Sequence, residues 1–118
     1  LKYSEEFSKY YVKGLSKIIE IALDEISKFT FRDKKYTINK QIFKIYWCLE
    51  ALKYFYEFAE YSELKNILVD CSKLQEYTVR EKCADIIKHI DLDEELSKTM
   101  YILEHDENYY VRKVFLNN

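Results

Sequence analysis

The sequence contains no proline and only one glycine, Gly14. These two residue types supply most of the tight turns in sandwiches, barrels and doubly wound sheets. With 118 residues, of which 48% are hydrophobic, the chain has enough apolar material for one core but almost nothing with which to build hairpins. We therefore expect an all-α protein that forms one domain over residues 1–118.

The sequence also lacks long apolar runs and a large excess of either charge. Charged residues such as Glu20 interrupt every apolar run, so no segment is expected to cross a bilayer, and the sequence predicts no signal peptide. The net charge of −2 gives no general attraction to phosphates or anionic lipid. Charge is nevertheless uneven, because residues 1–59 carry 11 basic and 8 acidic side chains whereas residues 60–118 carry 8 and 13.

Cysteine is scarce and odd in number: Cys48, Cys71 and Cys83. No disulfide scheme pairs all three, and no two have close spacing, so we expect buried free thiols in a reducing compartment, the cytoplasm. The chain begins at Leu1 and ends at Asn118, shortly after a helix-start signal. We expect it to be a fragment of a longer helical array.

Residues 4–60 predict two long amphipathic helices. Apolar residues recur at steps of three and four from Phe7 to Phe29, and again from Ile38 to Ala59. Ser4 is the expected N-cap of the first helix, and Gly14 is a point at which that helix could bend or divide. The charged stretch 32–35 predicts the loop between the two helices.

Four shorter helices are predicted after residue 60 from capping residues and apolar periodicity. The residues expected at their N-termini are Ser62, Thr78 with Glu81 as a capping box, Asp91 with Glu94, and Asn108 before Tyr109. A shift of 32 residues aligns 63–80 with 95–112 without a gap, and a shift of 41 relates 36–39 to 77–80. These internal repeats predict three helical hairpins, with units of about 4–60, 62–90 and 91–118.

The repeat pattern resembles the HEAT family, whose second helix typically opens with Val-Arg after an aspartate in the preceding turn. The matching positions are Val79, Arg80, Asp106, Val111 and Arg112. The middle unit departs from the pattern at Leu74, which replaces the aspartate, and the first unit has Ile38 and Asn39 in place of Val-Arg. The resemblance implies a right-handed stack of antiparallel helix hairpins, a short α-solenoid that usually serves as a protein-binding scaffold.

Physical reasoning favours a structural role for Arg80 and Arg112. A guanidinium at the start of a second helix can bridge carbonyls and carboxylates of adjacent turns, and each hairpin must pack on a neighbour to bury its apolar surface. A role in binding is the alternative.

Nothing in the sequence predicts catalysis. The three cysteines lie on or beside apolar stripes, two histidines are too few for a closed metal site, and one glycine cannot form a phosphate loop. We expect no enzyme activity, no cofactor and no metal.

A basic and aromatic segment, residues 28–47, is the first candidate for binding. It carries six basic residues and one acid between positions 28 and 44, together with Tyr36, Tyr46 and Trp47. The expected contacts with an acidic partner or a phosphate are Lys28, Arg32, Lys34 and Lys35. A solvated loop rim is the ordinary interpretation. Nucleic-acid binding, in which rings stack on bases, is the alternative function.

The second candidate is a stripe on the second helix, about 200° from its core stripe. Its candidate partner-binding residues are Lys40, Lys44, Trp47, Tyr54 and Phe58. The helix is either buried centrally between two others, or it presents an aromatic groove flanked by lysines. The leading hypothesis for function is a noncatalytic module that binds another protein or peptide.

Overall fold

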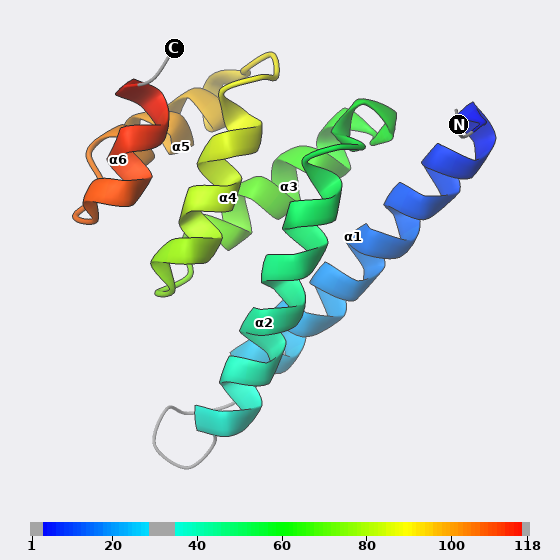
Figure 1. The fold of residues 1–118 in the computed structure, drawn as a ribbon, viewed down its shortest axis with the longest axis horizontal. Helices are drawn as coiled ribbons and strands as arrows, with labels where there is room; N and C mark the ends of the chain where they lie inside the picture. Colours follow the sequence, from blue (N-terminus) through cyan, green and yellow to red (C-terminus); the bar gives the residue numbers. More distant parts are fainter. Residues whose placement is uncertain (1–3, 29–34, 117–118) are drawn as a thin grey trace.

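The computed structural model describes residues 4–28 and 35–116, and within them every regular element is a helix (Figure 1). The elements are α1 (Glu5–Ser27), α2 (Lys35–Leu52), the 3-10 helix η1 (Tyr56–Phe58), α3 (Tyr61–Cys71), α4 (Tyr77–Ile87), α5 (Glu94–Glu104) and α6 (Tyr109–Leu116). The all-α expectation is confirmed. The basic residues Arg32 and Lys34 lie outside the described residues.

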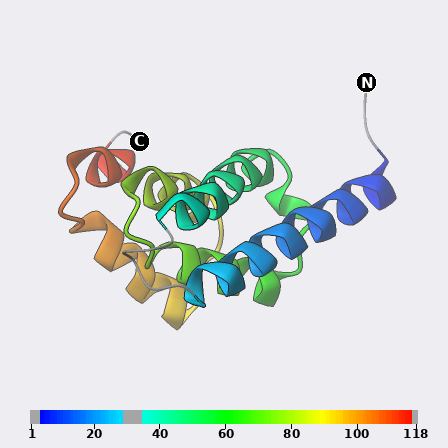
Figure 2. The same cartoon turned by 90° about the horizontal axis from the view of Figure 1, so that it is seen from below.

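The helices contact one another in a regular order. Each odd-numbered helix contacts the helix that follows it. In addition, α2 contacts α4, and α4 contacts α6. The odd-numbered helices do the same, because α1 contacts α3 and α3 contacts α5. In Figure 2, α2, α4 and α6 lie along one side of the molecule, and α1, α3 and α5 along the other.

The core lies between these two rows. Its largest fully buried side chains come from all six helices, and they are Val12, Ile19, Ile45, Leu49, Leu52, Leu68, Val79, Ile86, Ile87, Leu96, Leu103 and Val111. The three cysteines are buried and free, as the sequence predicts. No helix in the described part of the chain combines the length and the apolar character that crossing a membrane requires.

The start of α1 is as predicted, and its buried face agrees with the prediction in part. The Ser4 hydroxyl accepts a hydrogen bond from the Phe7 amide at 3.0 Å, and the helix continues through Gly14 without a break. Leu15 and Ala22 of the predicted stripe are buried, whereas Ile18 is exposed. Val12 and Ile19, which lie beside the stripe, are buried as well. Contacts with both α2 and α3 favour this neighbouring face, since it packs on two helices at once.

The second helix ends earlier than its periodicity predicts. Its core residues Ile38, Ile45 and Leu49 are buried as expected, but α2 stops at Leu52 and a turn leads into η1. The connection packs half-buried aromatic side chains, including Phe58, against the core. Leaving the helix axis is what brings these rings to the core, so Tyr54 and Phe58 do not continue the face of α2.

The capping box predicted at Thr78 is wrong. The helix α4 begins at Tyr77, and the Thr78 hydroxyl donates a hydrogen bond to the Glu76 carboxylate at 3.0 Å. The amides of Val79 and Arg80 reach the backbone carbonyl of Glu76 at 3.2 and 3.4 Å. The first turn is therefore closed by the Glu76 backbone.

The cap of α5 is Asp93, two residues beyond the predicted Asp91. The Asp93 carboxylate accepts a hydrogen bond from the Leu96 amide at 2.8 Å. The Tyr61 hydroxyl donates to the Asp91 carbonyl at 2.9 Å and accepts from the Asp93 amide at 3.0 Å. This contact fixes the loop, and thereby selects the capping residue.

The predicted start of α6 is confirmed, because the Asn108 side chain accepts a hydrogen bond from the Tyr110 amide at 2.8 Å.

Two neighbouring aspartates therefore provide a matched test of the helix start. We expect Asp93→Ala to lower the free energy of unfolding by about 1 kcal/mol, because an N-terminal amide of α5 loses its acceptor. Asp93→Asn should retain most of the stability, and Asp91→Ala should have little effect. Urea unfolding of the three variants measures this difference. An equal loss in Asp91→Ala and Asp93→Ala would contradict the assignment.

Candidate interaction surface

Three aromatic side chains project from the outward face of α2. Tyr36 is 81% exposed, Phe43 is 64% exposed and Trp47 is 53% exposed. Phe43 and Trp47 are one helical turn apart, and their rings meet edge to face with centroids 6.1 Å apart. We call Tyr36, Phe43 and Trp47 the aromatic ridge. Large apolar side chains in such an exposed group are characteristic of interaction surfaces.

The aromatic ridge is supported from the side by Tyr46. The Tyr46 ring lies edge to face against Trp47 at 5.2 Å, and the Lys82 ammonium lies 5.2 Å from the centre of the Tyr46 ring. Lys82 also forms an ion pair with Glu50, which in turn contacts Lys53 at 3.4 Å. The hydrogen bond from Lys82 is the main reason that the pKa of Glu50 is lowered. These contacts join α2 to α4 directly beside the rings.

The structure brings together three of the five predicted partner-binding residues. Lys40, Lys44 and Trp47 are exposed on α2. Tyr54 is exposed beyond the end of the helix, and Phe58 lies half-buried in η1. The interpretation of this stripe as a second buried face is wrong, because α2 contacts α1 and α4 through other faces and leaves Trp47 at the surface.

Sequence reasoning placed Tyr36 near the candidate site but missed Phe43. The signal was present, because Tyr36, Phe43 and Trp47 follow one another at steps of seven and four, which keeps them on one side of a helix. The core stripe of the same helix is also apolar, so the spacing of these three rings did not stand out from it.

Two of the four predicted phosphate contacts, Lys28 and Lys35, lie within the described residues. Lys28 lies just after α1, where it contacts Asp24 at 3.1 Å and Glu25 at 3.7 Å, and these acids raise the pKa of Lys28. Lys35 is exposed at the first position of α2. The Lys28 charge is therefore already balanced by its own helix.

Arg80 forms the most extensive polar contacts of the predicted repeat signature. Its Nε and Nη2 donate to the two carboxylate oxygens of Asp106 at 2.8 and 3.0 Å. Its Nη1 donates to the carbonyls of Leu74 and Gln75 at 3.0 and 2.7 Å. The predicted bridging of carbonyls and a carboxylate by this arginine is confirmed.

Arg112 repeats part of this arrangement. Its Nη1 donates to the Asp106 carbonyl at 2.6 Å, six residues earlier in the chain, as Arg80 does to Leu74. Burial would raise the pKa of Asp106, but the Arg80 hydrogen bond, the Asn108 amide and the charges of Arg80 and Arg112 outweigh it and lower that pKa. Val79 and Val111 are both fully buried.

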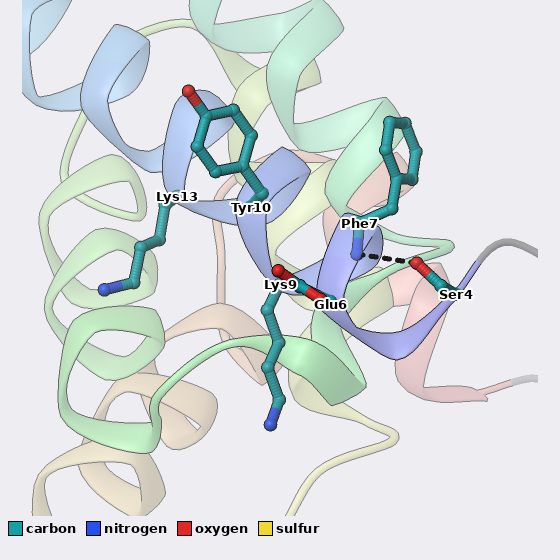
Figure 3. A pocket seen from close by; sticks show the side chains of 6 residues that line it. All are labelled: Ser4, Glu6, Phe7, Lys9, Tyr10 and Lys13. Carbon is teal, nitrogen blue, oxygen red and sulfur yellow. Dashed lines mark hydrogen bonds between the residues drawn. The ribbon is translucent and has the colours of Figure 1, made fainter.

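The described surface has several hollows. Figure 3 shows one at the start of α1, and all its lining residues come from that helix and its cap: Ser4, Glu6, Phe7, Lys9, Tyr10 and Lys13. Their side chains spread in different directions, so this hollow is open rather than enclosed. Among residues 4–28 and 35–116, no group of three histidine, cysteine or acidic side chains could hold a metal ion.

Comparisons of the chain with protein-family models, with curated proteins and with solved structures returned no match.

The exposure of Trp47, the only tryptophan, is directly measurable. We expect red-shifted emission that acrylamide quenches readily, and a loss of less than about 1 kcal/mol in Trp47→Ala, because little core packing is removed. Ile45→Ala, which truncates a buried side chain two residues away, should lose about 3 kcal/mol. Blue-shifted emission resistant to quenching would show that Trp47 is buried.

The contacts of Arg80 predict a large loss of stability in Arg80→Ala, about 3 kcal/mol, because the Asp106 carboxylate, with 7% of its side chain exposed, loses its main partner. Arg112→Ala is the matched control and should lose less, since it removes one carbonyl contact but no carboxylate pair. Urea unfolding measures both variants.

The Arg80–Asp106 pair also predicts that the stability of the fold depends on pH. Asp106 stabilises the fold while it is ionised, and this contribution should be lost as the pH falls from its ordinary pKa of 3.8 through the lower folded value. The stability difference between the parent protein and Asp106→Asn should therefore shrink at acid pH. A difference that is constant with pH would contradict an ionised Asp106.

Proposed function

We propose that this chain is a noncatalytic protein-interaction module built from HEAT-like helix hairpins stacked as a short solenoid. The aromatic ridge on α2 is the observation that carries the proposal. Its three rings are exposed, and two of them contact each other. Aromatic side chains of this kind dominate the energy of many protein interfaces, because they bury a large area at a small cost in side-chain entropy.

The order of helix contacts supports the repeat part of the proposal. Each helix contacts the next but one as well as its pair partner, which is what stacked hairpins require. The equivalent carbonyl contacts of Arg80 and Arg112 support it independently, since the two arginines are 32 positions apart, the period of the sequence repeat.

A rigid support for the rings is the second physical argument. The apolar side of α2 is anchored by Ile45 and Leu49, and its flank is joined to α4 through Glu50 and Lys82. A surface held in place before it binds loses less conformational entropy on association. The described residues offer no comparable support for catalysis.

Nucleic-acid binding has less support. Of the four predicted phosphate contacts, Lys28 is paired with acids of its own helix, and a strong interaction with a phosphate backbone needs several free cations together.

Photocrosslinking tests the proposed function. We expect a crosslinking amino acid in place of Phe43 to capture a defined protein that the same group in place of Tyr10, which is exposed on α1, does not capture. Once that protein is purified, Trp47→Ala should weaken its binding by tenfold or more, as for a hot-spot residue. Equal binding of the parent protein and Trp47→Ala by the purified partner would contradict a role for the aromatic ridge.

A further inference from the structure

Positive charge is concentrated along the helix that carries the aromatic ridge. Between Lys35 and Leu49 the helix α2 contains three lysines, at 35, 40 and 44, and no acidic residue. Its first acid, Glu50, is already occupied by Lys82 and Lys53. Within the described part of the chain, neither Lys40 nor Lys44 has an ion-pair partner, so their charges are available to a ligand.

The two lysines adjoin the rings in a defined geometry. At about 100° per residue, Lys40 lies roughly 20° around the helix from Trp47, and Lys44 lies roughly 60° from it. Because Lys40 and Lys44 are four residues apart, they lie about one helical turn from each other along the edge of the ridge. From Tyr36 to Trp47 the ridge extends for roughly 16 Å, which is the length of about three turns of a second helix.

The exposed apolar residues of α5 occur in a different electrostatic setting. Tyr101 and Ile102 are exposed on α5, which also carries Glu94, Glu95 and Glu104. An acidic ligand would be repelled there and attracted to α2. Local charge thus distinguishes the exposed apolar residues of α2 from those of α5.

We propose that the occupant of the aromatic ridge is an acidic amphipathic helix of a partner protein. Its apolar side chains pack on Phe43 and Trp47, and carboxylates one turn apart pair with Lys40 and Lys44. This assignment rests on the proposed function and specifies its partner class. The rings supply most of the affinity. The lysines select a partner of negative charge and orient it, as charges at an interface rim do.

The emission of Trp47 provides a direct test, because no other tryptophan contributes to the signal. The probes are a capped helical peptide of about four turns with leucine and phenylalanine on one face and glutamate on the flanks, and a twin in which lysine replaces every glutamate. Oligothymidylate is the nucleic-acid probe. All are titrated into the full chain at low ionic strength and again at physiological salt.

We expect the acidic peptide to shift the Trp47 emission to the blue and to bind at least tenfold more tightly than its lysine twin. Added salt should weaken its binding several-fold, because the lysine contacts are exposed and screened. The double variant Lys40→Glu, Lys44→Glu should lose most of the preference for the acidic peptide. The matched control, Lys9→Glu, Lys17→Glu, makes the same change in net charge at exposed positions on α1 and should retain that preference.

Equal binding of the two peptides, or an unchanged preference in the Lys40→Glu, Lys44→Glu variant, would overturn the acidic assignment. Absence of any emission change up to about 1 mM acidic peptide would overturn it as well. Tighter binding of oligothymidylate than of the acidic peptide would replace it with nucleic acid. The proposed function fails separately: a crosslinked partner that loses binding in Trp47→Ala but not in the charge-reversed variant would leave the module intact and refute only its acidic ligand.

Discussion

The guanidinium of Arg80 joins parts of the chain that are far apart in sequence. It contacts the carbonyls of the turn before α4 and the carboxylate of Asp106 in the turn before α6. Removing two charges from water is costly, and the cost is offset only where both groups find enough partners. Here Nε, Nη1 and Nη2 all donate, and Asp106 accepts from the Asn108 amide as well at 2.9 Å. The turn that leads into α6 therefore depends on Arg80, which lies 26 positions before Asp106.

A second polar contact holds α2 against α4, as the contacts of Arg80 hold the turn before α6. Glu50 and Lys82 join α2 to α4, and Lys82 also lies over the Tyr46 ring, which contacts Trp47. Exposed rings on an isolated helix would move freely, because side chains in contact with water exchange rotamers readily. On α2 they are backed by a buried apolar face and by a charged contact at its flank. The surface available to a partner is thus a consequence of the same packing that stabilises the fold.

Periodicity and repeats in the sequence were enough to predict six helices, the core side of α2 and the bridging role of Arg80. They were not enough to locate the start of α4 or α5, because α4 begins without a side-chain cap and α5 follows two neighbouring aspartates, Asp91 and Asp93. Contacts from elsewhere fix both starts: the Tyr61 hydroxyl fixes the loop at Asp91, and Arg80 holds the turn before Tyr77. Nor can a helical pattern show whether Trp47 faces solvent or another helix. A second apolar stripe looks the same in the sequence whether it faces solvent or another helix. The arrangement of α1 and α4 is what leaves the Trp47 stripe uncovered.

The overall charge of the chain would have been a poor guide to its surface. A net charge of −2 suggests weak repulsion of acidic ligands, yet electrostatic interactions between exposed groups are screened within about 8 Å at physiological salt. The molecule measures 44 × 30 × 26 Å, so the glutamates of α5 cannot cancel the field of lysines on α2 across most of its length. What a ligand at the aromatic ridge experiences is set by Lys40 and Lys44. Because Lys35, Lys40 and Lys44 are the charged residues of that helix without a described ion-pair partner, the charge beside the ridge is positive although the net charge of the chain is negative.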